Sequence, residues 1–323
     1  MTQMTTSLTC AAPGAPVLRL ATAAGPHVAA VVVSFHPDLA QLGRLLAALA
    51  PQCQQIIVVD NGSAEPVTRW LQQFSCPLPY RVLLLGSNQG IAAAQNHGIR
   101  SALHSGADYV VLFDHDSCPA PSMVAELLAV AQAQQAAGHL VAGVGPRFLD
   151  VRRNNPPPFV QQVGWRIVRH SCSGAETAVP VDYLISSGCL IPATALRAVG
   201  LMEEPLFIDY VDTEWCFRAQ SKGYSCFGAC KAHMEHDLGD APIRFIGRNI
   251  PMHSPLRHYY LFRNAVWLYR QPWVSLRWRL LDGWRLLLKY GFYTLFAKPR
   301  RAHWWHMSKG LLHGLVGKMG QAR

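Results

Sequence analysis

The sequence predicts an α/β protein with a mostly parallel central sheet and helices on both faces. Short apolar, β-branched runs alternate four times with segments of helical periodicity between residues 27 and 137. These runs are apolar at consecutive positions, which is typical of strands buried on both faces of a sheet. Half of the 323 residues are hydrophobic, enough for a large core.

The first half of the chain supplies four strand–helix pairs. Each expected strand ends in polar, turn-forming residues, as in "VVDNGS" and "LFDHDS". Ligands bind beyond the carboxyl ends of the strands in such sheets, so we expect a binding site at this edge. The strands are expected at 27–36, 54–63, 80–90 and 108–117, and the helices at 39–52, 64–74, 91–106 and 121–137.

The rest of the chain is less regular. Residues 181–200 predict a strand, a glycine turn and a helix, and residues 224–240 predict a strand followed by a loop. The N-terminus lacks the basic start and continuous apolar core of a signal peptide. The predicted organisation is a flexible tail at 1–26, an α/β domain at 27–250 and a basic helical region at 251–323.

Positive charge is concentrated at the C-terminal end. Residues 241–323 hold 15 Lys and Arg and one acid, Asp282, whereas residues 1–240 hold 14 Lys and Arg and 18 acids, which accounts for the net charge of +10. Basic regions meet phosphate, whether in nucleic acid, anionic lipid or a phosphorylated substrate.

The basic region also has an amphipathic pattern, typical of a helix that lies on an anionic membrane. A core-packing helix with a solvated face is the alternative, and nucleic-acid binding is disfavoured because no recognised module accompanies the charge. No run of 18 uncharged apolar residues occurs, so no transmembrane helix is required. The apolar positions are Trp273, Leu276, Leu280, Trp284, Leu287 and Leu288, and the cations are Arg277, Arg279, Arg285 and Lys289.

The nine cysteines are scattered and odd in number. Cys226, Cys230, His233 and His236 are close in sequence, but the short chelate spacing of a zinc site is not repeated. Reduced, mostly buried thiols in a cytoplasmic protein are the favoured interpretation.

The segment "LFDHDS" places Asp114 and Asp116 at the end of an apolar strand. Side chains alternate along a strand, so both carboxylates point to one face. Mg²⁺ and Mn²⁺ bind through one or two carboxylates together with substrate phosphates. The segment therefore predicts a metal–phosphate site, with a plain surface pair as the alternative.

Other loops carry polar residues or glycine. Asp60 either accepts hydrogen bonds from a base or ribose or forms an Asx turn or helix cap. Asn88 and Gly90 lie in a loop, with Asn96 about one helical turn further on. Gly188, in "SSGCLIP", either lets an acceptor approach the backbone or forms a plain turn. Neither a dinucleotide-binding glycine pattern nor a phosphate loop occurs, which disfavours nicotinamide and ATP binding.

Three acids lie among large apolar residues in "LFIDYVDTEWCFRAQSKGY": Asp209, Asp212 and Glu214. A carboxylate in apolar surroundings has a raised proton affinity, which suits a general base near neutral pH. Asp212 alternatively caps the helix that follows it, in which Arg218 lies four positions after Glu214.

Taken together, these segments resemble inverting family-2 glycosyltransferases with the GT-A fold, most closely bacterial rhamnosyltransferases of surface-polysaccharide synthesis. The motifs are "VVVSFHPD", "VVDNGS", "SNQGIAAAQNHGI", "LFDHDS", "SSGCLIP" and "FIDYVDTEWCFRAQSKGY", in this order over roughly residues 27–240. The rhamnosyl likeness rests mainly on the last motif.

The resemblance implies a role for each motif. Asp212 would be the catalytic base, supported by Glu214, although Val211 breaks the Glu-Asp pair that many relatives have here. A bound Mg²⁺ or Mn²⁺ would stabilise the departing diphosphate in a single displacement. The donor site would comprise Ser34, Phe35, Asp60, Asn88, Gly90, Asn96, Asp114, His115 and Asp116. The acceptor site would comprise Gly188, Asp209 and Trp215, and the metal ligands would be Asp114, Asp116 and His236.

The resemblance further implies transfer of L-rhamnose from dTDP-L-rhamnose to a lipid-linked or polysaccharide hydroxyl, by a cytoplasmic protein peripheral to the inner face of the cell membrane. The alternatives are a UDP- or GDP-sugar donor, or an inactive nucleotide-binding scaffold at the membrane. A pyrophosphorylase-like nucleotidyltransferase is disfavoured because a glycine-rich phosphate loop is missing after the first strand.

Overall fold

The structure is a computed structural model, and it describes residues 25–63, 67–149, 158–236, 243–245, 248–250 and 252–322. Residues 1–24 of the predicted tail lie outside the described residues. The strands are β1 (Val28–Ser34), β2 (Gln55–Asp60), β3 (Tyr80–Leu84), β4 (Tyr109–Asp114), β5 (Ser117–Pro119), β6 (Val141–Leu149), β7 (Phe159–Val163), β8 (Arg166–His170), β9 (Ala178–Val181), β10 (Leu190–Pro192), β11 (Ser225–His236), β12 (Ile243–Phe245) and β13 (Arg248–Ile250). The helices are α1 (Leu39–Leu49), α2 (Val67–Gln73), α3 (Ile91–His104), α4 (Met123–Ala136), α5 (Ala193–Val199), α6 (Val211–Ser221), α7 (Pro255–Tyr269), α8 (Leu276–Phe296) and α9 (Arg300–Val316), with a short 3₁₀ helix at Glu204–Leu206.

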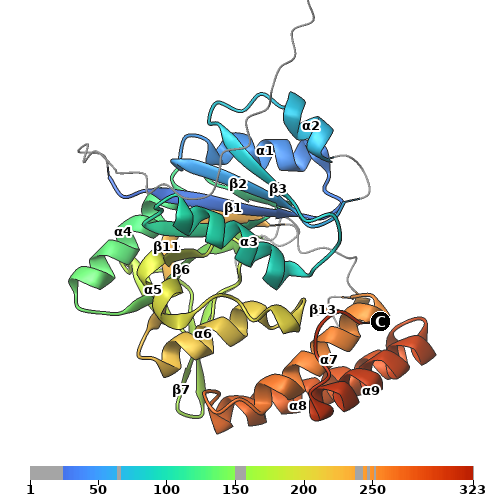
Figure 1. The fold of residues 1–323 in the computed structure, drawn as a ribbon. Coiled ribbons are helices and arrows are strands. Elements are labelled where there is room, and N and C mark those ends of the chain that lie inside the picture. Colours follow the sequence, from blue (N-terminus) through green and yellow to red (C-terminus); the bar gives the residue numbers. More distant parts are fainter. Residues whose placement is uncertain are drawn as a thin grey trace, which may run out of the picture.

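Within the described residues, nine strands form one central sheet in the order β3–β2–β1–β4–β10–β6–β11–β5, with β9 paired to β11 (Figure 1). The strands from β3 to β4 are parallel, as are β6 and β11, and the other pairs are antiparallel. The predicted α/β fold with helices on both faces is confirmed. Each antiparallel pair of the central sheet involves β10 or β11, which lie in the second half of the chain, where the sequence was less regular.

Strand β1 shows why its sequence is apolar at every position. All of its residues are buried. Val31 and Val33 enter one hydrophobic core with α3, whereas Ala30 and Val32 enter a second core with α1 and α4. Because successive side chains of a strand point to opposite faces, a sheet covered by helices on both faces needs apolar residues at both sets of positions.

The prediction that the thiols are reduced is wrong for one pair, because Cys172 and Cys230 form a disulfide with their Cα atoms 5.4 Å apart. The two cysteines are 58 positions apart in sequence, and the pairing of Ala178 in β9 with Ala229 in β11 brings them together. Cys230 is therefore not free to bind zinc. Among the described side chains, no group of three or more potential ligands surrounds a metal position.

The basic region is helical, as predicted from about Pro255 onward. Helix α7 begins at Pro255, with the Ser254 side chain capping its N-terminus, and α9 packs along α7. In the described part of the chain, no helix is both long and apolar enough to cross a bilayer. The domain boundaries drawn from the sequence stay predictions.

Candidate active site

A cavity of about 580 Å³ opens at the carboxyl ends of β1 and β4. Its volume is in the range of sites that bind nucleotides and other small molecules. The loop before α3 and residues 185–187 and 207–212 complete the lining, together with residues at the start of α7. The predicted site residues that line it are Phe35, Asn88, Gly90, Asp114, His115, Asp116, Asp209 and Asp212.

Ser34 and Asp60 are buried at the ends of β1 and β2 and do not line the cavity. Asp60 accepts hydrogen bonds from Ser34 Oγ at 3.3 Å, Ser63 N at 3.2 Å and Ser63 Oγ at 2.5 Å. These contacts match the turn that the sequence left open for Asp60. Its side chain therefore holds the loop after β2 in place.

Asn61, which the sequence analysis overlooked, lines the cavity instead. Its side chain donates to Asn88 Oδ1 at 3.1 Å and accepts from Gln89 N at 2.9 Å. The contacts fix the Asn88 loop against the end of β2. The available signal was its position, one residue beyond the acid that ends a strand.

Asn96 does not reach the cavity either. It is 1% exposed, and its amide group donates to Met202 O and Glu204 Oε1 and accepts from Met202 N, each at 2.9 Å. Asn96 thus joins α3 to the segment that leads to α6. Its buried hydrogen bonds give it a structural place in this fold rather than a place in the donor site.

Gly188 supports the cavity from behind. It has φ of +80°, and a Cβ there would lie 2.7 Å from Pro146 Cγ, so the turn requires glycine. The preceding Ser186 and Ser187 are the ones that line the cavity. Ser187 Oγ accepts from Asp114 N at 3.2 Å, which connects this turn to the end of β4.

Glu214 and Trp215 point into the core from α6. Glu214 is fully buried and bonded to Arg218 Nε at 2.7 Å and to a second guanidinium nitrogen at 3.0 Å. Trp215 is 2% exposed and donates from Nε1 to Gly200 O at 2.8 Å. Neither residue lines the cavity, so the structure separates Asp212 from the other acid of its helix.

The segment just before Asp212 has a strained backbone. Phe207, Asp209 and Tyr210 have positive φ angles of 68°, 65° and 63°. Such conformations cost about 1–3 kcal/mol each for residues other than glycine, and they persist only where the surroundings enforce them. The strain therefore identifies a segment whose geometry is held by other parts of the molecule.

Helix α7 holds this segment. Asn264 is fully buried. Its side-chain amide donates to the backbone carbonyls of Leu206 at 2.9 Å, Ile208 at 2.7 Å and Asp209 at 2.9 Å. The neighbouring Arg263, also buried, donates to Leu206 O at 2.8 Å. The basic C-terminal region is thus connected directly to the candidate catalytic segment.

We expect Asn264→Ala to lower kcat by about 10–100-fold while leaving the Kd for the expected nucleotide-sugar donor nearly unchanged, because it frees the strained backbone next to Asp212 and not the strand ends that carry the expected donor residues. The lost hydrogen bonds also lower the melting temperature. Arg279→Ala is the matched control, since it removes side-chain bonds of 2.9 and 2.7 Å to carbonyls in the turn before α8. A kcat loss of equal size in the control would contradict a positioning role for Asn264.

Asp212 has the electrostatics of a general base. Burial raises the pKa of its carboxyl from 3.8 to about 6, the nearby Asp209 and Asp114 also raise it, and hydrogen bonds from the backbone amides of Thr213 and Ser186 oppose the shift. The Thr213 bond is 2.7 Å long. At neutral pH the carboxylate is ionised yet binds a proton more strongly than an ordinary aspartate.

Arg257 from the first turn of α7, and His253 just before that helix, also line the cavity. Arg257 contacts Asp209 Oδ1 through Nε at 3.3 Å and through a terminal nitrogen at 3.2 Å. The other oxygen of Asp209 is buried without a hydrogen-bond partner. No sequence motif indicated either residue, because only the tertiary structure places the start of α7 beside the strand ends.

Asp114 and Asp116 fit a divalent cation. Both line the same cavity, at and just after the end of β4, and carboxylate oxygens are the donors that such an ion accepts. Mg²⁺ and Mn²⁺ are commonly held by one or two carboxylates, with phosphate and water oxygens at the remaining positions. The side chain of His236, the third predicted ligand, lies outside what the structure describes.

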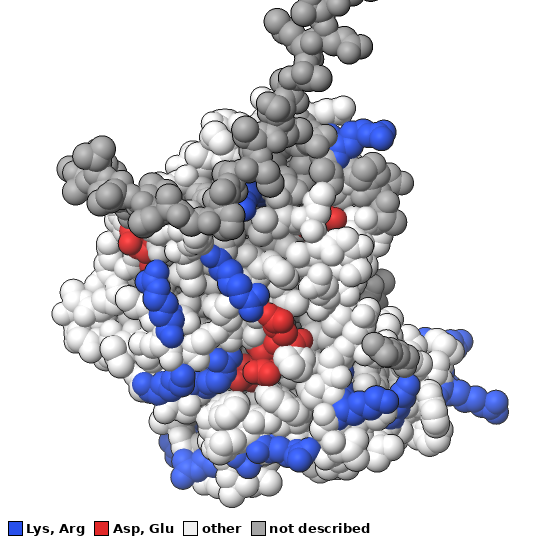
Figure 2. Space-filling view, in the orientation of Figure 1, with Lys and Arg blue, Asp and Glu red and all other residues white. Residues whose placement is uncertain are grey.

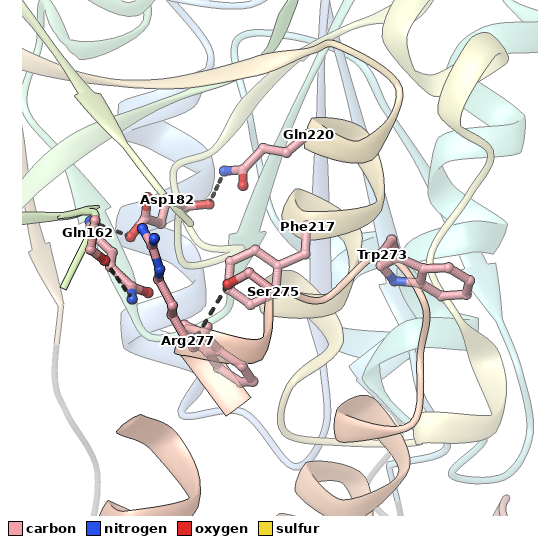
Figure 3. A pocket seen from close by; sticks show the side chains of 9 residues that line it. Gln162, Asp182, Phe217, Gln220, Trp273, Ser275 and Arg277 are labelled. Atoms are coloured by element: carbon pink, nitrogen blue, oxygen red, sulfur yellow. Dashed lines mark hydrogen bonds between the residues drawn. The ribbon is translucent and has the colours of Figure 1, made fainter. Parts of the chain in front are cut away.

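A smaller cavity of about 270 Å³ is lined by Phe217 and Gln220 of α6 and by residues of the turn before α8 and its start (Figure 3). None of the predicted site residues lines it. Its polar groups bind one another: Gln162 N donates to Asp182 at 2.6 Å, and Gln220 Nε2 donates to the carbonyl of Asp182. Its Phe217 and Trp278 rings pack edge to face at 4.8 Å. The predicted chemistry thus belongs to the larger cavity.

The sheet order and the aspartates at one cavity define a GT-A-type fold, and solved structures show it. The mannosyltransferase PcManGT from Pyrobaculum calidifontis, in complex with GDP-Man and Mn²⁺, superposes with a TM-score of 0.55 at 15% identity, over 92% of this chain and 89% of that one. GalNAc-T7 with UDP, GalNAc and Mn²⁺ gives a TM-score of 0.55 at 11% identity over 90% of this chain, which spans only 56% of the GalNAc-T7 chain.

The chain belongs to glycosyltransferase family 2. The family description "Glycosyl transferase family 2" matches residues 30–186. The dTDP-rhamnosyl transferase RfbF of Shigella flexneri is 33% identical over 296 residues, which cover 91% of this chain and 96% of RfbF. The galactofuranosyltransferase GlfT1 of Mycolicibacterium smegmatis is 28% identical over 290 residues, which cover 84% of this chain and 91% of GlfT1.

Proposed function

We propose that this protein is a metal-dependent inverting rhamnosyltransferase, which transfers L-rhamnose from dTDP-L-rhamnose to a hydroxyl of a lipid-linked or polysaccharide acceptor. The observation that carries the proposal is a single cavity lined by Asp114 and Asp116 and by the high-pKa Asp212. The 33% identity to a dTDP-rhamnosyl transferase over nearly the whole chain supports the donor.

The proposed reaction is one displacement. The Asp212 carboxylate accepts the proton of the acceptor hydroxyl, whose oxygen then bonds to the anomeric carbon of the sugar. The bond from that carbon to the diphosphate oxygen breaks, and dTDP leaves. Asp114 and Asp116 would hold Mg²⁺ or Mn²⁺, which when bound neutralises charge on the diphosphate. Arg257, 43% exposed, also lines the cavity, where its guanidinium pairs with Asp209.

The binding roles follow from the lining. Phe35, Asn88, Gly90 and His115 would contact the donor, with Asn61 added by the structure and Asp60 acting through the loop that it holds. Asp209 would lie toward the acceptor. A cytoplasmic location at the inner face of the membrane would suit a lipid-linked acceptor.

A UDP- or GDP-sugar is the second candidate donor, and the relative GlfT1 is named for transfer of a different sugar, galactofuranose. A thermal-shift panel of nucleotide sugars with Mn²⁺ separates the donors. We expect dTDP-rhamnose to stabilise the protein most, by raising its free energy of unfolding by a few kcal/mol at ~100–1,000 times its Kd. Omitting Mn²⁺ is the control. A larger shift with a UDP- or GDP-sugar would overturn the rhamnosyl assignment, and no shift with any nucleotide sugar would overturn the transferase proposal.

A further inference from the structure

Helices α8 and α9 expose an unusual amount of apolar surface. Of the 20 large hydrophobic side chains that are exposed among the described residues, 12 belong to these two helices, which are only 21 and 17 residues long. Isolated exposed apolar residues are ordinary, but a large cluster on one part of a protein indicates a surface that meets another apolar phase.

Six of the seven large hydrophobic side chains that are exposed on α8 form one stripe. At 3.6 residues per turn, their spacing places them within about one third of the helix circumference. Leu286 and Tyr293 are buried on a different side, so the exposed stripe is not the face that packs on the protein. The stripe consists of Leu276, Leu280, Trp284, Leu287, Leu288 and Leu295, which are 55–66% exposed.

Helix α9 likewise has one buried face and one face with exposed apolar side chains. Its buried residues, among them Met307 and Gly310, face α7, where a Cβ at Gly310 would lie 2.5 Å from the Tyr259 carbonyl oxygen. The close approach seats α9 firmly on α7. The exposed residues on its other side are Trp304, Trp305, Leu312, Leu315 and Val316, at 47–66%. The core-packing alternative from the sequence therefore does not account for these side chains.

The charge around this surface is of one sign. Asp282, the only acid in residues 241–323, is turned toward the protein and accepts hydrogen bonds from Tyr210 at 2.8 Å and Tyr269 at 2.7 Å. Figure 2 shows Lys and Arg along the lower part of the molecule, where α8 and α9 lie in Figure 1, and Asp and Glu only above it. The exposed cations include Arg285, Lys289, Lys298, Arg300, Arg301 and Lys318.

The exposed apolar side chains and the surrounding positive charge together indicate which partner this surface binds. A second copy of the chain, joined about a two-fold axis, would set the cationic surface against itself, and like charges in contact repel. An anionic lipid surface satisfies both features, because acyl chains receive the Trp and Leu side chains while the headgroups neutralise Lys and Arg. Since neither helix is suited to cross a bilayer, this mode of binding lies in the interface.

The same helices are fixed to the candidate catalytic segment. Asp282 of α8 binds Tyr210, which lines the cavity two positions before Asp212. Helix α9 packs on α7, whose Asn264 holds the carbonyls of the segment before Asp212. A membrane bound at α8 and α9 would therefore be held in a fixed relation to the cavity.

We propose that α8 and α9 form a docking surface for an anionic bilayer and lie parallel to it in the headgroup region. Trp273, which the sequence pattern included, is half-buried in the turn before α8 and is not part of this surface. The membrane role deepens the proposed function, since a lipid-linked acceptor would be delivered to a cavity fixed beside the bilayer. Binding itself requires neither donor nor acceptor.

The test is sedimentation of the full chain with vesicles, without nucleotide. We expect at least 10-fold tighter binding to phosphatidylcholine vesicles that contain about 30% phosphatidylglycerol than to phosphatidylcholine alone, and weakening at about 0.5 M NaCl. Leu280→Glu together with Leu287→Glu should weaken binding by at least 10-fold. The matched control, Leu84→Glu with Leu140→Glu, changes two side chains that are each 54% exposed elsewhere and should bind as the unaltered protein does.

Four outcomes would overturn the proposal. They are no binding to anionic vesicles, full binding by the Leu280 and Leu287 double variant, equal loss of binding in both double variants, and a dimer in light scattering that the Leu280 and Leu287 variant dissociates. The last outcome would make a second copy of the chain the occupant of this surface. Because no nucleotide is present, failure of the rhamnosyl donor assignment leaves these results untouched, and failure here leaves the donor assignment standing.

Discussion

Asp212→Asn is expected to reduce kcat by about 10²–10⁴-fold with little change in donor binding, because it removes the proposed proton acceptor and keeps the size of the side chain. In the unaltered enzyme, kcat/KM should rise with pH up to the pKa of about 6 and stay level above it, since only the ionised carboxylate accepts a proton. Initial rates across pH 4.5–8 (an interval spanning that pKa) check both expectations.

The same substitution is expected to raise the stability of the protein although it lowers the activity. The pKa of Asp212 is about 6 in the folded protein, above its ordinary 3.8. The unfolded chain therefore ionises first as the pH rises, and stability falls between these two values. The Asn side chain does not ionise, so it loses no stability as the pH rises. Asp212→Asn should therefore melt at a higher temperature than the unaltered protein at pH 8, and the difference should shrink below pH 6. A residue kept for stability alone would show the reverse at pH 8.

Glu214→Gln is the control for this experiment. It leaves the buried Arg218 without its charged partner, which costs about 3–5 kcal/mol when one member of a buried pair is lost. We expect a lower melting temperature but retained turnover per folded molecule at low temperature. If Glu214→Gln lost turnover while Asp212→Asn kept it, the assignment of the base would be reversed.

Asp116→Ala is expected to abolish the Mn²⁺-dependent part of the thermal shift with dTDP-rhamnose and to lower kcat/KM by about 10²–10³-fold, because one of two proposed carboxylate ligands is lost. Chelation with EDTA should reproduce the loss in the unaltered protein, and added Mn²⁺ should reverse it. The shift measurement reports ligand binding independently of turnover.

Glu126→Ala is a matched loss of one carboxylate from the first turn of α4, away from the cavity lining. It should leave the Mn²⁺ dependence as it is in the unaltered protein. An unchanged Mn²⁺-dependent shift in Asp116→Ala would contradict the metal role of Asp116.

The sequence supported the fold because its strongest signals were local. The apolar runs ending at Ser34, Asp60 and Asp114 identified three of the parallel strands, and their polar ends indicated the edge that carries the cavity. Hairpin β7–β8 was not predicted, because its strands are half-exposed and lack a clear alternation.

The site was harder to predict because proximity to a motif does not determine where a side chain points. Asn96 and Trp215 both lie in motifs of the family resemblance, yet both are buried in contacts with the protein. Asn61 and Arg257 line the cavity although no motif singled them out. One residue of difference reverses the direction of a side chain along a strand and turns it by about 100° around a helix.

The sequence by itself determined the α/β architecture, the family likeness, the Asp-x-Asp pair and the basic amphipathic end, since each depends on residue type and spacing. Only the tertiary structure decided that Asp212 and not Glu214 meets the cavity, that Cys172 pairs with Cys230, and that Asn264 holds the segment before Asp212. These relations join residues far apart in the chain, and no local pattern encodes such contacts because they arise from how the elements pack.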